Sequence, residues 1–257
     1  MLVAFDLDRT IVTEDFRMPP QIEGTIKRVR EAGHVVTVIT GRARVSADEF
    51  LKQLDIKEFY SVNHGALVMG KDELILHHSR IKPHEADAII KPYMDVEGLE
   101  FSFFEGDVFY VRNPQDPRWE WAQTQHRMME KYQPNLGLHA DKIVFGSDTP
   151  LLQMRDDILK QFPEFVTYLW ADGYLEITGV QADKGSALKL LSETLGFEQK
   201  DTIAFGDGPN DVTMIQWAGR GIAVGPSAYH EVLEAASEHI PRPEELGVAK
   251  WLEKNLL

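Results

Sequence analysis

The stretch "AFDLDRT", residues 4–10, places two aspartates directly after an apolar run. Residues 2–5 are all apolar, which is typical of a strand in a sheet that is covered on both faces. Asp6 and Asp8 are separated by a single residue, so their like charges repel each other at neutral pH. A buried strand that ends in such a pair needs a compensating group, and the rest of the chain offers candidates.

The alternation of strands and helices on both sides of this stretch predicts the fold class. "HVVTVIT" (residues 34–40), "TIAFG" (202–206) and "GIAVG" (221–225) predict further strands. Apolar residues at helical spacing predict the helices between them: Ile22, Ile26 and Val29, then Leu188, Leu191 and Leu195. This order predicts an α/β protein with a doubly wound, parallel-sheet, Rossmann-like core.

The middle of the chain has a different pattern. Residues 81–180 predict the order αββαβαββ, with helices near 83–94, 119–131 and 150–161 and hairpins around Gly106 and Gly173. This order indicates an α+β unit inserted into the first domain. We therefore expect residues 1–80 and 181–257 to form a Rossmann-like core and residues 81–180 to form an inserted domain.

Composition excludes several classes of function. Asp and Glu outnumber Lys and Arg by 41 to 27, and the formal net charge of −14 opposes binding to nucleic acid or anionic membrane. The chain has no cysteine, so it has neither a disulfide framework nor a thiolate zinc site. Neither a signal peptide nor a membrane-spanning run is recognisable in the sequence. We expect a cytoplasmic enzyme or binding protein.

Acidic and polar motifs follow three of the predicted strands. Asp6 and Asp8 follow the first strand, "TGR" (residues 40–42) follows the second, and "GDGPND" (206–211) follows a later one. Ligands bind at the carboxyl ends of strands in open α/β sheets, so neighbouring strands would bring these carboxylates together. A cluster of carboxylates requires a cation, and oxygen ligands favour a hard ion such as Mg²⁺.

The same residues suit phosphoryl transfer. One carboxylate can act as a nucleophile, and a second one nearby can act as acid and base. Thr40 and Gly41 offer a hydroxyl and backbone N–H groups for phosphoryl oxygens, and Lys184 can balance the remaining charge. Taken singly, each motif is at least as often a turn, a helix cap or a surface lysine as it is part of a functional site. The four motifs together, in one alternating fold, favour a functional site.

With these motifs the sequence resembles the haloacid dehalogenase-like superfamily of phosphohydrolases. The motifs "DLDRT", "TGR", Lys184 in "DKGSAL" and "GDGPND" occur in the family's order, and the inserted unit resembles the type IIB cap of the Cof-type branch. The resemblance implies that residues 1–80 and 181–257 form the catalytic core and that residues 81–180 form a cap domain that sets substrate specificity. The resemblance implies that Asp6 is the nucleophile and a metal ligand. It implies that Asp8 is the general acid/base and also faces the metal through its backbone carbonyl.

The resemblance also implies roles for the other motif residues. Asp207 would complete the protein ligands of a Mg²⁺ ion, and Asp211 would orient a water bound to that ion. Thr40, Gly41, Lys184 and Asn210 would bind the phosphoryl group, and Thr10 would support the loop. The sequence departs from the family pattern at two places, because Arg9 stands where glycine is usual and "NHGA" (residues 63–66) puts His64 where asparagine is usual. We expect Arg9 to point to solvent, and either Asn63 or His64 to fill the asparagine's place.

The substrate is the least specified part of the prediction. Arg42, Arg112, Arg118 and Asp172 are polar candidates for substrate contacts. The leading hypothesis is a Mg²⁺-dependent phosphatase that hydrolyses a small phosphorylated metabolite through an aspartyl-phosphate. Sugar phosphates are the first expectation, followed by flavin or pyridoxal-type phosphates. The alternatives are a phosphomutase of the same superfamily, a phospho-acceptor signalling domain or a non-catalytic binding protein. A dehalogenase is disfavoured because that reaction does not require metal-binding acids, and nothing indicates the oligomeric state.

Overall fold

The structure is a computed structural model that describes residues 1–120, 128–226 and 229–257. The chain divides into two compact units. The first, here called the core unit, comprises Met1–Arg42, Ala47–His77 and Asp183–Leu257. The second, here called the inserted unit, comprises His78–Ala182 together with Ala43–Ser46. The core unit is therefore built from both ends of the chain.

A five-stranded parallel sheet lies at the centre of the core unit, in the order β14-β13-β12-β1-β2. The strands are β1 (Leu2–Phe5), β2 (Val35–Val38), β12 (Thr202–Gly206), β13 (Arg220–Val224) and β14 (Glu238–Ile240). Phe5 on β1 lies opposite Phe205 on one side and Val38 on the other. Because the three strands run in the same direction and end in register, the residues that follow them meet at one edge of the sheet.

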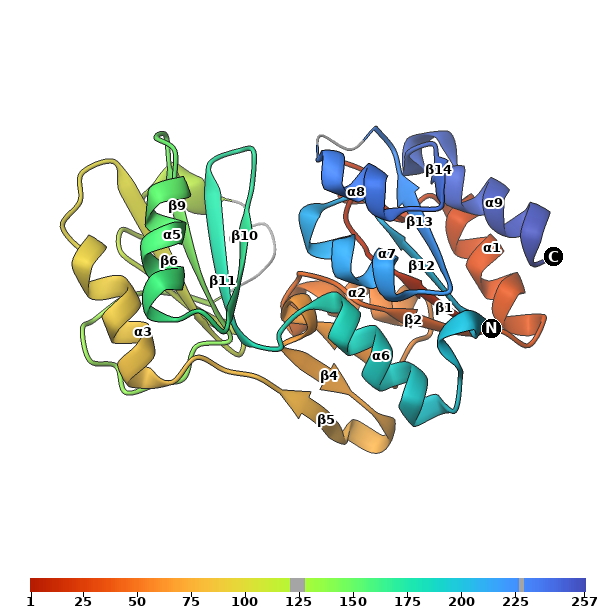
Figure 1. Cartoon of the computed structure of the whole chain (residues 1–257), viewed down its shortest axis with the longest axis horizontal. Coiled ribbons are helices and arrows are strands. Elements are labelled where there is room, and N and C mark those ends of the chain that lie inside the picture. The colour runs from red at the N-terminus through yellow and green to blue at the C-terminus, as the bar shows by residue number, and fades with distance from the viewer. Residues whose placement is uncertain (121–127, 227–228) are drawn as a thin grey trace. The chain divides into compact units, whose positions relative to one another are not determined.

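Helices cover both faces of this sheet (Figure 1). Alternate residues of β1 face opposite sides, so Val3 and Phe5 pack against one helical layer, and Leu2 and Ala4 pack against the other. The first layer contains α1 (Pro20–Glu31), α2 (Arg44–Gln53) and α9 (Gly247–Asn255), and the second contains α6 (Lys184–Leu195) and α7 (Val212–Trp217). The predicted doubly wound α/β core is confirmed.

Short elements connect the core unit. A small sheet has the order β3-β4-β5 and comprises β3 (Tyr60–Val62), β4 (Leu67–Met69) and β5 (Ile75–His78). A bridge between Ile39 and Ser61 joins β3 to the end of β2. The remaining helical elements are α8 (His230–Ala235), η1 (Asn63–Gly65), η2 (Lys71–Glu73), η5 (Gln199–Asp201), η6 (Pro209–Asp211) and η7 (Pro243–Glu245).

The inserted unit is an α+β unit with a six-stranded sheet in the order β10-β11-β9-β6-β7-β8. Its strands are β6 (Leu99–Glu105), β7 (Val108–Val111), β8 (Met128–Lys131), β9 (Lys142–Ser147), β10 (Phe165–Leu169) and β11 (Tyr174–Val180). One face of the sheet packs against α3 (Pro83–Ile90) and α5 (Leu152–Gln161), which lie on the same side of it in Figure 1. Two 3-10 helices, η3 (Lys91–Tyr93) and η4 (Pro117–Trp119), complete its described elements.

One predicted helix of the inserted unit is wrong in part. Residues 128–131, expected to be helical, form strand β8, which pairs in parallel with β7 from Val108↔Met128 to Val111↔Lys131. Backbone hydrogen bonding along a sheet edge here outweighs the helix propensity of the methionine, glutamate and lysine side chains. The predicted helix also covers residues 121–127, which lie outside the described part of the chain.

Candidate active site

The loop after β1 holds the two aspartates that open the sequence. The backbone N–H of Asp6 donates to the carbonyl oxygen of Phe205 at 3.0 Å, which ties the end of β1 to β12. Beyond it, the carbonyl oxygen of Leu7 accepts backbone N–H groups from three successive residues, Thr10, Ile11 and Val12, at 2.8 to 3.2 Å, closing a tight loop. Asp6 is 5% exposed. The Asp8 side chain is 42% exposed, so the two carboxylates differ in their access to water.

Lys184, the first residue of α6, lies between two carboxylates. Its Nζ is 2.7 Å from Oδ1 of Asp6 and 2.6 Å from Oδ1 of Asp211, and its side chain is fully buried. Burial alone would lower the pKa of Lys184, but the charges of Asp211 and Asp6 outweigh it and raise that pKa. The helix start is fixed by Asp183, whose carboxylate accepts the backbone N–H of Ser186 at 2.9 Å. Lys184 is therefore a fixed, charged group.

The loop after β12 supplies the other acids. Asp211 is fully buried, and its Oδ2 accepts the backbone N–H groups of Asp207 and Gly208, each at 3.0 Å. Gly206 is needed where β12 ends, because a Cβ there would overlap the Asp211 side chain. Carboxylate oxygens of Asp6, Asp207 and Asp211 all lie within 4.8 Å of one another. The structure thus brings the predicted acids of two motifs to one point.

The electrostatics of this cluster call for a cation. Burial raises the pKa of Asp6 to about 7, with Asp211 and Asp8 adding to the rise and Lys184 opposing it. Burial likewise raises the pKa of Asp207, and the charges of Asp211 and Asp6 raise it further. Three carboxylates against one ammonium leave two uncompensated negative charges when all are ionised. A divalent ion with oxygen ligands fits this donor set in charge and in chemistry.

The "TGR" motif lies beside the cluster, after β2. Thr40 is fully buried, and its Oγ1 accepts the backbone N–H of Arg42 at 3.1 Å, so its own hydroxyl hydrogen remains to be donated. Asn210 in η6 is 6% exposed, and its amide nitrogen lies 3.0 Å from Nδ1 of His64. His64 in turn packs against Gly41. The residues predicted to bind a phosphoryl group therefore belong to one connected set.

Arg42 makes a contact that sequence reasoning missed. Its Nε and Nη2 donate to the two carboxylate oxygens of Asp8, at 2.9 and 2.6 Å. Burial would lower the pKa of Arg42, but the hydrogen bonds and charge of Asp8 raise it. The sequence singled out Arg42 only as a candidate substrate contact. Its guanidinium is engaged by the predicted acid/base, a residue 34 positions away in the chain.

Arg9 has a strained backbone. Its φ is +55°, a left-handed value that residues with a Cβ adopt rarely. Its side chain is exposed, as predicted, and it lines a cavity of about 260 Å³ together with Asp207, Tyr229 and Arg242. The charge of Arg9 is among the groups that lower the pKa of Asp207, although burial dominates and raises it. Arg9 therefore lies within electrostatic reach of the acidic cluster.

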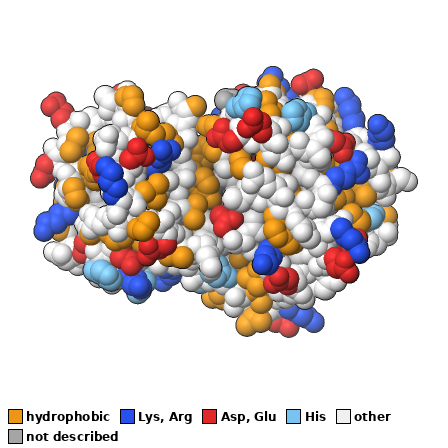
Figure 2. All heavy atoms as spheres, viewed as in Figure 1, with side chains coloured by type: hydrophobic (Ala, Val, Ile, Leu, Met, Phe, Trp, Pro, Cys, Tyr) orange, Lys and Arg blue, Asp and Glu red, His pale blue; other side chains and the backbone are white. Residues whose placement is uncertain are grey.

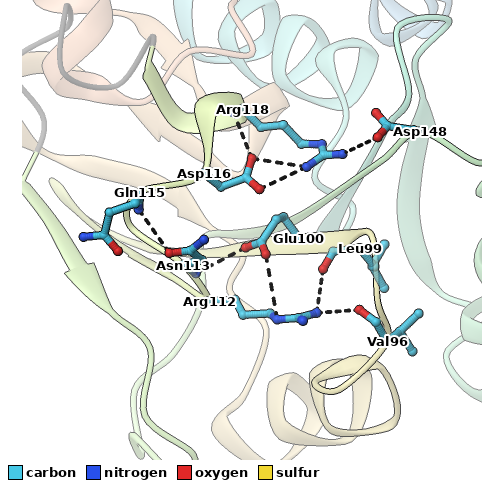
Figure 3. Close-up of polar contacts among 9 residues, drawn as sticks. All are labelled: Val96, Leu99, Glu100, Arg112, Asn113, Gln115, Asp116, Arg118 and Asp148. Carbon is cyan, nitrogen blue, oxygen red and sulfur yellow. Dashed lines mark hydrogen bonds and ion pairs between the residues drawn. The ribbon is translucent and has the colours of Figure 1, made fainter.

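The two arginines singled out in the inserted unit are held by its own carbonyl and carboxylate groups (Figure 3). Arg112 donates to the carbonyl oxygens of Val96 and Leu99, both at 2.6 Å. Arg118 pairs with Asp116 at 3.1 Å and with Asp148 at 2.8 Å.

Asp172, the third predicted contact of this unit, is exposed in the turn between β10 and β11. Both arginine contacts stabilise the loops around β6, β7 and β9, and substrate binding by these three residues stays a prediction.

A family model for haloacid dehalogenase-like hydrolases matches residues 3–252. Among curated proteins, the chain is similar to the HMP-PP phosphatase of Klebsiella pneumoniae (27% identity, covering 87% of this chain and 84% of the relative). It is also similar to the 5-amino-6-(5-phospho-D-ribitylamino)uracil phosphatase of Bacillus subtilis (28% identity, covering 99% and 97%).

Among solved structures, a sugar phosphatase of haloacid dehalogenase subclass IIB shares the fold. The TM-score is 0.83 at 20% identity, and the match covers 98% of each chain. A fold match over nearly the whole of both chains includes the inserted unit as well as the core unit. With a family model spanning almost the entire sequence and the four motifs in order, the chain belongs to the haloacid dehalogenase-like hydrolase family, as its sequence predicted.

Proposed function

We propose that this enzyme is a Mg²⁺-dependent phosphatase that hydrolyses a small phosphorylated metabolite through an aspartyl-phosphate on Asp6. The observation that carries the proposal is the close arrangement of buried Asp6, Lys184 and Asp211 with the partly exposed Asp207, and with Asp8 two residues from the nucleophile. Buried like charges held this close are expensive unless a cation and a transferring group use them. The named relatives, which are phosphatases, support the same reaction class.

Asp6, Asp207 and the backbone carbonyl of Asp8 would hold the metal, and Asp211 would orient a water molecule bound to it. When bound, Mg²⁺ neutralises charge on the phosphoryl oxygens and on the carboxylates. Asp211 suits an orienting role because Lys184 and two backbone N–H groups already fix both of its oxygens.

The protein residues then account for both half-reactions. A carboxylate oxygen of Asp6 attacks phosphorus, the bond to the leaving oxygen breaks, and Asp8 donates a proton to that oxygen. In the second half, Asp8 takes a proton from water as the water attacks phosphorus, which releases phosphate and restores Asp6. Thr40, Gly41, Lys184 and Asn210 would bind the phosphoryl oxygens throughout.

Charge and the comparisons bear on the substrate. The relatives are named as phosphatases of HMP-PP and of 5-amino-6-(5-phospho-D-ribitylamino)uracil. For this chain we propose sugar phosphates first and flavin or pyridoxal-type phosphates next. The inserted unit would recognise the leaving group. On the face drawn in Figure 2, basic and acidic side chains are interspersed. That pattern and the net charge of −14 support a small-molecule ligand rather than nucleic acid or membrane.

In residues 1–120, 128–226 and 229–257, the structure has no helix with the length and apolar character that crossing a membrane requires.

The test is phosphate release from a panel of phosphorylated sugars, nucleotides, flavins and pyridoxal compounds, with Mg²⁺ and with chelator. We expect Mg²⁺-dependent release from at least one compound, and none from Asp6→Asn, because an amide cannot form the acyl phosphate. Asp95→Asn, the same change at an exposed turn of the inserted unit, is the matched control and should match the wild type.

Unimpaired release by Asp6→Asn would contradict the nucleophile assignment. A rearranged phosphate ester in place of free phosphate would identify a phosphomutase instead.

A further inference from the structure

The turn Asn63–Gly65 has a strained backbone. Its three residues have φ values of +51°, +59° and +99° in succession, and the first two carry side chains. Left-handed conformations are uncommon at residues with a Cβ, although Asn and His adopt them more readily than most, and three in succession define a tight turn. The contacts of this turn therefore indicate what it is built to do.

Backbone hydrogen bonds fix the turn to the "TGR" loop. Asn63 donates its N–H to the carbonyl oxygen of Arg42 at 2.8 Å, and His64 donates its N–H to the carbonyl oxygen of Thr40 at 3.0 Å. On the other side, Gly65 lies so close to the carbonyl oxygen of Asp183 that a Cβ would overlap it. The turn therefore packs between the loop of the proposed phosphate site and the start of the helix that carries Lys184.

The imidazole ring of His64 fills the remaining space. His64 is 2% exposed, and a Cβ at position 41 would overlap its ring, so the ring requires glycine there. Nδ1 of His64 lies 3.0 Å from Nδ2 of Asn210. The ring therefore contacts the "TGR" and "GDGPND" motifs at the same time, at a point where the side chains are shielded from water.

Hydrogen-bond chemistry assigns the roles in this contact. An amide nitrogen only donates, so Nδ1 of His64 accepts, and the proton of the neutral ring is on Nε2. The amide nitrogen of Asn210 keeps a second hydrogen, which can be donated to an anion. The Nε2-protonated ring and this orientation of the Asn210 amide require each other, because the flipped amide would place an oxygen against an acceptor.

We propose that His64 is a positioning residue of the phosphoryl site. Its Nδ1 orients the amide of Asn210 so that the nitrogen can donate to a phosphoryl oxygen, and its ring keeps position 41 free of a side chain. The inference rests on the proposed function, since it assumes that Asn210 and Gly41 contact a phosphoryl group. It assigns to His64 an effect on phosphate binding that acts through Asn210.

Two substitutions separate this role from simple space filling. His64→Gln keeps an acceptor for the Asn210 amide, and His64→Leu keeps much of the volume and loses the acceptor. The probe is inorganic phosphate with Mg²⁺, measured by calorimetry, alongside kcat/KM on the best substrate. We expect His64→Leu to weaken phosphate binding about tenfold, the size of one lost charge-assisted hydrogen bond. His64→Gln should retain most of the wild-type affinity for phosphate. His84→Leu, at an exposed position on α3, should leave that affinity unchanged.

A double-mutant comparison tests the route through Asn210. Asn210→Ala should weaken phosphate binding as much as His64→Leu does, and the double variant should be no worse than either single one. If the affinity losses of the two single variants multiplied in the double variant, the proposal would be overturned. Unchanged phosphate binding in His64→Leu would also overturn it. Circular dichroism and thermal melts show whether each variant folds.

An observation on the wild type needs no substitution. Nitrogen NMR of the folded protein should show the His64 ring protonated at Nε2 and unprotonated at Nδ1. A proton on Nδ1 would overturn the assignment. Failure of the proposed function has a different signature, because the wild type would then release no phosphate from any compound, while the NMR result for His64 would be unaffected.

Discussion

Arg42 holds Asp8 by both carboxylate oxygens, with Nε 2.9 Å from Oδ2 and Nη2 2.6 Å from Oδ1. The guanidinium carbon lies 4.8 Å from the ring centroid of Phe50 and 5.6 Å from that of Phe16. Two parallel charge-assisted hydrogen bonds fix the plane of a carboxylate, and the flanking rings fix the plane of the guanidinium. The direction in which Asp8 faces is thereby set by a residue from the neighbouring strand end.

Replacing Arg42 by lysine should lower kcat without a matching change in KM. A single ammonium cannot form the two-pronged contact, so Asp8 would be oriented less well, while the charge is retained. We expect a fall of about tenfold in kcat, since the positioning of one acid/base group is affected. Steady-state kinetics on the best substrate measure it. Arg17→Lys, at an exposed pair with Asp15, is the matched control. A rise in KM alone would instead assign Arg42 to substrate binding.

Asp207→Asn should make the metal-free protein more stable and abolish its response to Mg²⁺. The pKa of Asp207 is raised by burial and by its acidic neighbours, so an uncharged isostere removes an unfavourable charge from the folded state. The wild type should gain thermal stability on addition of Mg²⁺, because a ligand that binds only the native state stabilises it. Melting temperatures with chelator and with Mg²⁺ measure both effects. A variant that still gains stability from Mg²⁺ would remove Asp207 from the metal site.

The stability of the metal-free protein should fall as pH rises from about 4 to about 7. Burial raises the pKa of Asp6 from 3.8 to about 7 in the folded state, so within this window the native protein keeps a proton that the unfolded chain has released. Unfolding then releases protons, and the free energy of unfolding decreases with pH until it levels off above the folded pKa.

Denaturant midpoints recorded across that range in the presence of chelator test the sign of this effect, and Asp6→Asn should have a shallower slope. Because the raised pKa of Asp207 acts in the same direction, the slope should be reduced rather than removed. A wild-type stability that increases through the window would contradict the raised pKa of Asp6.

Arg9→Gly should be more stable than Arg9→Ala. Both variants remove the guanidinium, but only glycine adopts a φ of +55° without steric cost. The difference in the free energy of unfolding should be about 1 kcal/mol, the penalty of a left-handed residue with a Cβ, reduced by the greater freedom of glycine in the unfolded chain. Urea titrations of the two variants measure it. Equal stabilities would mean that the loop relaxes when the side chain is shortened.

The strands at the centre of the core unit were predicted from short runs of apolar and β-branched residues. The uninterrupted apolar run of β1 and the β-branched run of β2 identify buried strands because both faces of each are covered. Short polar edge strands give no such signal. β14 (Glu238–Ile240) was not predicted, since it is three residues long and carries a glutamate and a histidine. β8 was mistaken for a helix for a related reason, as its exposed residues are poor indicators of a strand.

Motif spacing predicted which residues of the core unit gather at the site, but not how their side chains pair. Asp6, Lys184 and Asp211 are placed by strand and helix ends, which the sequence indicates. The contact of Arg42 with Asp8, and that of His64 with Asn210, depend on side-chain directions in separate loops. The hydrophobic periodicity of the sequence does not indicate where loop side chains point, so these contacts are seen only in the folded structure.

The position of β1 at the centre of the sheet has a consequence for synthesis on the ribosome. One edge of β1 pairs with β2, which begins at Val35, but the other pairs with β12, which begins at Thr202. While the intervening residues are translated, the apolar edge of Leu2–Phe5 has no partner, and an open edge of this kind is a template for association with other chains. The risk of association therefore belongs to the half-made chain, and it ends when β12 pairs with β1 and encloses it at the centre of the sheet.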